Sequence, residues 1–161
     1  MGLRYQEQYL GACFFVTTSF KGHSRFGDIP GVYERLAESL SYRLDKTQAQ
    51  LTAYVFMPSH IHLLLLIDGK LLASFMRDFK KYTAQKGIVE LCRNQHIWQP
   101  RYDRQAIITL KVMLTKINYI HLNPVKAELV EKSEDWNWSS AADYLGREKG
   151  PVPVFMDWYC V

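Results

Sequence analysis

The stretch "LTAYVFMPSHIHLLLLI", residues 51–67, decides the fold of this chain. Two apolar runs flank the dipeptide Pro58-Ser59, and this pattern predicts two antiparallel strands joined by a tight turn. Because strand side chains alternate between the two faces of a sheet, His60 and His62 share one face with the leucines that follow at every second position. Both faces become apolar beyond the histidines, so other elements must cover the sheet on both sides.

Outside this hairpin, the hydrophobic spacing switches between strand and helix periods. The resulting order is β-α-β-β-α-β followed by one more helix, which predicts an α+β fold: a ferredoxin-like antiparallel sheet with an added C-terminal helix. No repeat or Gly/Pro/Ser-rich linker divides the chain before its proline-containing tail, so residues 1–161 are expected to form a single domain. The expected elements are a strand at 12–20, helices at 32–44 and 71–92, a short strand within 96–107, and a helix at 106–123 that Pro124 should end.

The composition is that of an ordinary folded protein. Hydrophobic residues make up 48% and charged residues 22% of the chain, which is unlike a disordered segment. The three cysteines are far apart, so we expect reduced thiols rather than a metal ribbon or a redox pair. We expect no targeting signal, because the start of the sequence has no extended apolar core behind a basic leader. We expect no membrane span, because polar residues interrupt the apolar run at 51–67, and we therefore predict a cytoplasmic protein.

Positive charge is concentrated in one part of the sequence. The net charge is +4, but residues 77–126 contain ten Lys/Arg against three Asp/Glu. A local excess of this sign is typical of a protein that binds a polyanion such as nucleic acid. A solvated basic face is the alternative explanation of the same charge pattern.

The His-x-His pair also has two explanations. Histidines satisfied by their neighbours in or beside the core are the commoner case, but imidazoles at i, i+2 can also converge on one metal ion. In "INYIHLNPV", residues 117–125, Tyr119 and Asn123 are four positions apart and share one helix face. If this helix packs over the histidines, two imidazoles and an amide oxygen would suit Mg²⁺ or Mn²⁺. Tyr119 could then act as a nucleophile, or be an ordinary residue of an amphipathic helix.

Five motifs in order resemble a known family: "FMPSHIHLLLLI", "FKKYTAQKG", "IWQPRYDRQAI", "INYIHLNPVKAELV" and "DWNWSSAADYL". Together they are similar to the single-tyrosine HUH transposases of small insertion sequences (IS200-like), and more narrowly to the REP-associated tyrosine transposases. The resemblance implies that His60 and His62 are the metal pair, that Asn123 is the third ligand, and that Tyr119 is the nucleophile. The chain departs from the family pattern at the turn serine, in "RYDRQAI", and at Glu128, where glycine is common.

The resemblance implies a DNA transposase that cleaves single-stranded DNA beside a hairpin and later rejoins it without ATP, through a 5′-phosphotyrosine. It implies Mg²⁺ or Mn²⁺ as cofactor, hairpin DNA as partner, and a monomer or a homodimer. A hairpin-binding protein without activity and a metal-dependent hydrolase that does not need the tyrosine are the alternatives. HUH replication initiators and relaxases share the chemistry, but they are usually larger and ordered differently. The expected phosphate contacts are Arg77, Lys80, Lys81, Lys86, Arg101 and Arg104.

The remaining aromatic and histidine residues receive weaker assignments. Trp98 and Tyr102 could stack on unpaired bases, although for Trp98 we favour a place in the core over a stacking role. The tryptophans of "DWNWSS", residues 135–140, are assigned to packing of the C-terminal segment. His23, His96 and His121 show no ligand partners in the sequence, and His121 should point away from the face that carries Tyr119.

Overall fold

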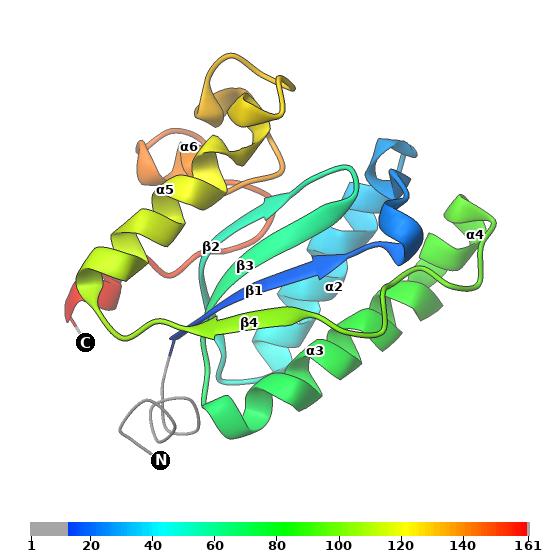
Figure 1. Cartoon of the computed structure of the whole chain (residues 1–161), viewed down its shortest axis with the longest axis horizontal. Coiled ribbons are helices and arrows are strands. Elements are labelled where there is room, and N and C mark those ends of the chain that lie inside the picture. Colours follow the sequence, from blue (N-terminus) through cyan, green and yellow to red (C-terminus); the bar gives the residue numbers. More distant parts are fainter. Residues whose placement is uncertain (1–12, 161) are drawn as a thin grey trace.

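A four-stranded antiparallel sheet forms the centre of the molecule, which we describe from a computed structural model covering residues 13–160 (Figure 1). The strand order is β2-β3-β1-β4, and β3 lies antiparallel to both of its neighbours. Strands β1 and β2 therefore run in the same direction with β3 between them, which is a split β-α-β arrangement. The strands are β1 (Cys13–Ser19), β2 (Gln50–Phe56), β3 (His60–Leu66) and β4 (Asp103–Ala106).

Helices cover both faces of the sheet, as its two apolar faces require. Helices α2 (Val32–Lys46) and α3 (Gly69–Thr83) lie on one face, and α5 (Leu110–Lys126) lies on the other (Figure 1). The element order is the predicted β-α-β-β-α-β followed by a helix that carries Tyr119, and the predicted α+β class is confirmed. The short elements are α4 (Val89–Cys92), α6 (Ala141–Tyr144) and the turns Lys21–His23, Phe26–Asp28, Ala84–Ile88, Ser133–Asp135 and Asp157–Cys160.

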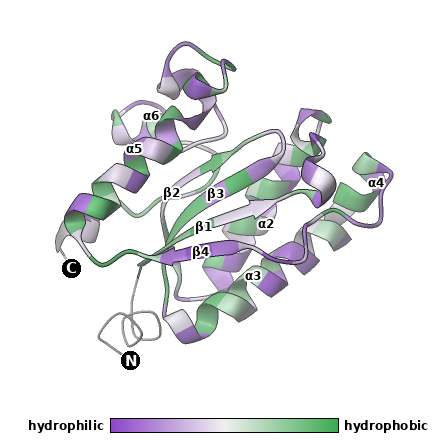
Figure 2. Ribbon diagram, in the orientation of Figure 1, coloured by the Kyte–Doolittle hydropathy of each residue, from purple (hydrophilic) through white to green (hydrophobic). Residues whose placement is uncertain are grey.

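Two cores separate along β3 as strand alternation predicts. Ile61, Leu63 and Leu65 pack into the larger core with α2 and α3, whereas Leu64 packs with Ile117 and other residues of α5. The hydropathy colouring shows β3 largely hydrophobic and the edge strand β4 hydrophilic (Figure 2). The face shared by the two histidines is therefore the face under α5.

Helix α5 does not end at Pro124, contrary to the prediction. It continues to Lys126 and closes with a Schellman motif, in which Leu129 N–H donates to Pro124 O and Glu128 N–H donates to Val125 O. Pro124 lies inside the last turn of α5, and the closing residue Glu128 has a φ of 58°. That left-handed conformation explains why glycine is common at this position in the family that the sequence resembles.

The predicted helix at 71–92 is also interrupted. Helix α3 ends at Thr83, a wider π-type turn spans Ala84–Ile88, and α4 follows. Gly87 has a φ of 96°, which an α-helix cannot accommodate. The local apolar spacing continues through this region, so periodicity alone could not reveal the break.

The C-terminal segment packs back onto the sheet. The Trp136 indole N–H donates to Phe56 O at 2.9 Å, and the rings of Trp136 and Trp138 contact Tyr33. Both tryptophans are thus packing residues, as predicted. In the part of the chain that the structure describes, no helix has the length and apolar character needed to cross a membrane.

Candidate active site

His60 and His62 lie at the end of the sheet where the turn joins β2 to β3. Met57 N–H donates to His60 O at 2.8 Å, which closes the turn and fixes where β3 begins. In the register of β1 and β3, Thr17 lies opposite His62 and Ser19 lies opposite His60. Directly opposed residues of an antiparallel pair point to the same face, so these four side chains share one surface.

His62 is held in one orientation by contacts on two sides. Its Nδ1 is 2.8 Å from the Thr17 hydroxyl, and its ring stacks on Phe15 with centroids 5.4 Å apart. The side chain is only 4% exposed, and its Nε2 is buried without a hydrogen-bond partner among the described residues. Burial, then the charges of His60 and Lys116, lower the pKa of His62 to about 3. The imidazole is therefore neutral at physiological pH.

His60 repeats this arrangement closer to the surface. Its Nδ1 is 3.1 Å from the Ser59 hydroxyl, and its ring lies 4.8 Å from that of His62. Burial and the charge of His23 lower the pKa of His60. In both histidines a hydroxyl occupies Nδ1, which leaves the two Nε2 lone pairs available to a ligand.

Helix α5 brings Tyr119 next to His62. The two rings lie 5.3 Å apart at 70°, and Phe15 contacts the same tyrosine edge-on at 5.9 Å. Tyr119 is 39% exposed, although its ring contacts the almost fully buried imidazole of His62. The phenol is therefore accessible from solvent while its ring is fixed by the sheet.

Asn123 is one turn beyond Tyr119 on the same helix and is partly buried. Its amide makes no hydrogen bond to another described residue, so its oxygen is available. No group of three or more His, Cys, Asp and Glu side chains within residues 13–160 could hold a metal ion. Among the described residues, the Asn123 amide oxygen is a candidate for a third ligand because it is unengaged and lies on the helix that covers the histidine face.

Two lysines that the sequence analysis did not single out flank the tyrosine. Lys116 Nζ lies 4.5 Å from the Phe15 ring centroid and 5.7 Å from that of Tyr119. Lys126 Nζ lies 5.8 Å from the Tyr119 ring centroid. Helical spacing could have identified both, because positions three before and seven after a residue share its face.

The predicted DNA contacts do not gather around this site. Arg77 and Lys81 are exposed on α3, on the other side of the sheet, and Arg77 forms an ion pair with Asp78. Arg104 lies opposite Val16 in the register, so it also faces away from the histidines. The side chain of Lys86 lies outside those that the structure describes. Of the six predicted residues, Arg101 lines a cavity that lies beside the histidine pair.

Lys80 makes internal contacts. Its Nζ donates to Gln99 O at 2.9 Å and to Arg101 O at 3.3 Å, and burial lowers its pKa to about 8. It lies over the rings of Trp98 and Tyr102, both of which pack against the larger core. Lys80 therefore fixes the segment that precedes β4, and Trp98 is a core residue as predicted.

The other histidines divide into two groups. His121 is buried and its Nε2 is 2.8 Å from the Ser140 hydroxyl, so it points away from the site as predicted. His96 is exposed near the turn before Trp98. His23 is exposed, but it lies near enough to His60 to help lower the pKa of His60, a proximity that hydrophobic spacing cannot reveal.

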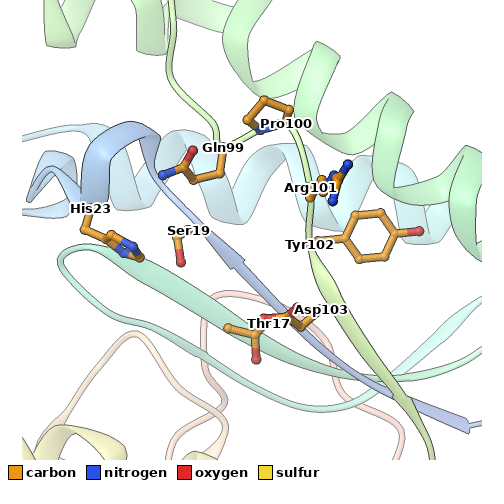
Figure 3. Close-up of a pocket in the computed structure, with 8 residues that line it drawn as sticks. All are labelled: Thr17, Ser19, His23, Gln99, Pro100, Arg101, Tyr102 and Asp103. Carbon is orange, nitrogen blue, oxygen red and sulfur yellow. The ribbon is translucent and has the colours of Figure 1, made fainter.

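A cavity of about 440 Å³ lies beside the histidine pair (Figure 3). It is bounded by the end of β1, by His23, and by the segment leading into β4. Figure 3 shows His23, Ser19 and Gln99 around one end, Thr17 and Asp103 at the other, and the Tyr102 ring pointing away from them. Thr17 links the cavity to the site, because it also hydrogen-bonds His62.

Known proteins resemble this chain in sequence and in structure. The family model described as "Transposase IS200 like" matches residues 19–123. A relative named "REP-associated tyrosine transposase" from Escherichia coli (strain K12) is 27% identical over 157 residues, which is 96% of this chain and 89% of the relative. A "Putative REP-associated tyrosine transposase" from Haemophilus influenzae (strain ATCC 51907 / DSM 11121 / KW20 / Rd) is 31% identical over 99 residues, covering 55% of this chain and 56% of the relative.

Two solved structures share the fold. One, described as "Structure of the REP associates tyrosine transposase bound to a REP hairpin", has a TM-score of 0.72 at 26% identity and covers 86% of this chain and 81% of its own. The other, a putative transposase from Deinococcus radiodurans, has a TM-score of 0.52 at 17% identity and covers 67% of this chain and 87% of its own. The second likeness concerns the fold alone.

Proposed function

Because this chain belongs to the IS200-like transposase family, we propose that it is a single-strand DNA endonuclease and strand transferase with Tyr119 as its nucleophile. The family membership confirms the resemblance found in the sequence motifs. One observation carries the proposal: an exposed phenol lies against an almost fully buried imidazole whose Nε2 has no partner among the described residues. The similar structure bound to a REP hairpin supports single-stranded DNA beside a hairpin as the substrate.

The proposed cofactor is Mg²⁺ or Mn²⁺. The residues fit such an ion, since His60 and His62 have free Nε2 atoms and Asn123 has an unengaged amide oxygen. When bound, the ion would act as a Lewis acid on the scissile phosphate. Neutral imidazoles are the form that can ligate a metal, and burial keeps these two neutral.

In the proposed reaction the Tyr119 Oη attacks the phosphorus atom. The new bond joins the phenol oxygen to phosphorus, the bond between phosphorus and the 3′-oxygen breaks, and the phenol gives up its proton as the 3′-oxygen gains one. The products are a 5′-phosphotyrosine and a free 3′-OH. The reverse attack by another 3′-OH rejoins DNA, and no ATP is needed because one phosphodiester is exchanged for another.

The side chains around Tyr119 orient it for this attack. Phe15 and His62 contact its ring from the sheet, which restricts the ring to few orientations. Lys116 places a positive charge beside the ring, where the phosphate must approach. Positioning of this kind raises the rate of the chemical step, because the reacting atoms are already aligned in the bound complex.

The test is a covalent adduct assay. The protein is incubated with Mn²⁺ and labelled single-stranded hairpin DNA from beside its own gene, and a denaturing gel is examined for a protein–DNA species. We expect an adduct that disappears with chelator and in Tyr119→Phe. Tyr42→Phe is a matched control, because Tyr42 is 41% exposed on α2, on the opposite side of the sheet.

Two results would contradict the proposal. Cleavage that persists in Tyr119→Phe would remove the tyrosine from the chemistry and favour a metal-dependent hydrolase. Hairpin binding without any adduct, across several flanking sequences, would instead indicate a binding protein that has retained the fold.

A further inference from the structure

The cavity beside the histidine pair contains polar groups that the cleavage chemistry does not use. Ser19, Gln99 and Asp103 line it, and their side chains make no hydrogen bond or ion pair with other described residues. We propose that this cavity binds one nucleobase of the DNA strand and selects a base that carries an exocyclic amino group. This inference rests on the proposed function, since it identifies which part of the substrate lies beside the cleaved bond.

The register of the sheet places the cavity next to the proposed phosphate position. His62, Thr17 and Asp103 form one row across β3, β1 and β4 on the same face. Neighbouring strands are about 4.8 Å apart, so Asp103 lies about 10 Å from His62 along this row. When a phosphate lies against the histidines and Tyr119, the base of an adjoining nucleotide can reach the cavity.

The lining offers separate groups to the base and to the phosphate of one nucleotide. The carboxylate of Asp103 accepts hydrogen bonds from an amino group such as cytosine N4, whereas the guanidinium of Arg101, on the same lining, can pair with the phosphate that this carboxylate would repel. Adenine and guanine also carry an exocyclic amino group, whereas thymine offers only oxygen acceptors and a ring N–H. Gln99 adds an amide that can both donate and accept, the combination used to read adenine. The cavity volume of about 440 Å³ exceeds that of one base, which leaves room for the sugar.

The cavity wall is fixed before any ligand binds. Gln99 N–H donates to Ser19 O at 2.9 Å, and Lys80 Nζ donates to Gln99 O at 2.9 Å. The Trp98 indole N–H donates to the Thr83 hydroxyl at 2.8 Å, which anchors the same segment to α3. A wall held from both sides loses little conformational entropy on binding, so its polar groups can discriminate between bases.

The experiment measures binding in a Tyr119→Phe background, in which the proposed nucleophile is absent. Hairpin oligonucleotides carry a single abasic site at each flanking position in turn, and their affinities are measured by fluorescence anisotropy. The sensitive position is then filled with each of the four bases. The same series is repeated with Asp103→Ala and Gln99→Ala. Gln105→Ala is the control, since Gln105 shares this face of β4 but does not line the cavity.

We expect one flanking position at which an abasic site or thymine weakens binding by about 5- to 150-fold. That penalty should largely disappear in Asp103→Ala and persist in Gln105→Ala, because only the first variant removes the group that reads the base. Asp103→Asn should bind thymine better relative to cytosine than the Tyr119→Phe parent does, because an amide can also donate. Far-ultraviolet circular dichroism of each variant checks that the fold is intact.

Equal penalties in Asp103→Ala and its parent at every position would overturn the inference. The adduct assay with the otherwise unaltered chain separates this failure from failure of the proposed function. If an adduct forms but the penalty for an abasic site or thymine does not depend on Asp103, only the base site is rejected. If that penalty depends on Asp103 but no adduct forms, the base site is supported and cleavage is rejected.

Discussion

The Thr17 hydroxyl should control how well His62 binds a metal ion. It lies 2.8 Å from His62 Nδ1 and is the only hydrogen-bond partner of that nitrogen among the described residues. A metal on Nε2 requires the proton to sit on Nδ1, where it would donate to this hydroxyl. Thr17→Val keeps the shape of the side chain and removes only the acceptor.

Loss of such a partner typically weakens metal binding by about 10- to 100-fold, equivalent to about 1.4 to 2.7 kcal/mol. The upper part of this range applies here, because His62 is 4% exposed and water cannot easily replace the hydroxyl. The metal-free variant should also lose about 1 to 3 kcal/mol of unfolding free energy, since a buried ring nitrogen is left unpaired.

Thr18→Val is the matched control. Thr18 is the next residue on β1, points to the opposite face, and has a buried hydroxyl without a partner among the described residues. Replacing an unpaired buried hydroxyl with a methyl group should leave stability unchanged or raise it.

The assay is calorimetric titration with Mn²⁺, combined with urea unfolding of the metal-free proteins. Mn²⁺ affinity should fall in Thr17→Val and remain unchanged in Thr18→Val. Mn²⁺ binding that is equally tight in Thr17→Val and the wild type would refute the assignment of His62 Nε2 as a ligand oriented by this hydroxyl.

Three further changes test other parts of the structure. Glu128→Gly should raise the unfolding free energy in urea by about 1 kcal/mol, because Glu128 has a φ of 58° at the end of α5, and an unchanged midpoint would contradict this explanation. Burial lowers the pKa of His121 to about 4, whereas the pKa of an unfolded histidine is about 6.5. The unfolded chain therefore binds a proton before the folded one does, and the free energy of unfolding falls as the pH drops from about 6.5 toward 4. His121→Gln should therefore reduce the pH dependence of unfolding free energy in this window by up to about 1.4 kcal/mol per pH unit, and an unchanged slope would show that His121 is not the titrating group. Lys116→Met should slow adduct formation at saturating DNA at least tenfold, about 1.4 kcal/mol, whereas Lys111→Met, an exposed change on the same helix, should not; equal rates would exclude a role for Lys116 beside Tyr119.

The parts of the site that depend on local periodicity were predictable. Alternation along β3 placed both histidines on one face, and four-residue spacing placed Tyr119 and Asn123 on one side of a helix. The sequence also required a cover for the histidine face, and α5 provides it. These inferences hold because strand and helix periods do not depend on the rest of the fold.

The predicted phosphate contacts could not be placed with the same certainty. Charge density identifies a basic segment, but it does not show which face of the sheet α3 covers. Arg77 and Lys81 are on the face away from the histidines, and Lys80 is engaged by the carbonyl groups of the segment before β4. Such contacts arise from chain packing over long sequence separations, for which periodicity carries no information.

The charge around the histidines has a consequence for both metal binding and DNA binding. Burial and then the charges of His60 and Lys116 lower the pKa of His62, so the cation that would attract a phosphate adds to the effects that disfavour protonation of the proposed ligand. A carboxylate in the place of Lys116 would do the opposite, since it would stabilise the imidazolium and repel DNA. The site can therefore be basic overall and still contain two neutral imidazoles, because its cations lie on α5 while His62 is buried in the sheet and His60 is partly buried beside it. This separation explains how a helix and a strand that are far apart in sequence can together supply the proposed nucleophile, its counter-charges and the proposed metal ligands.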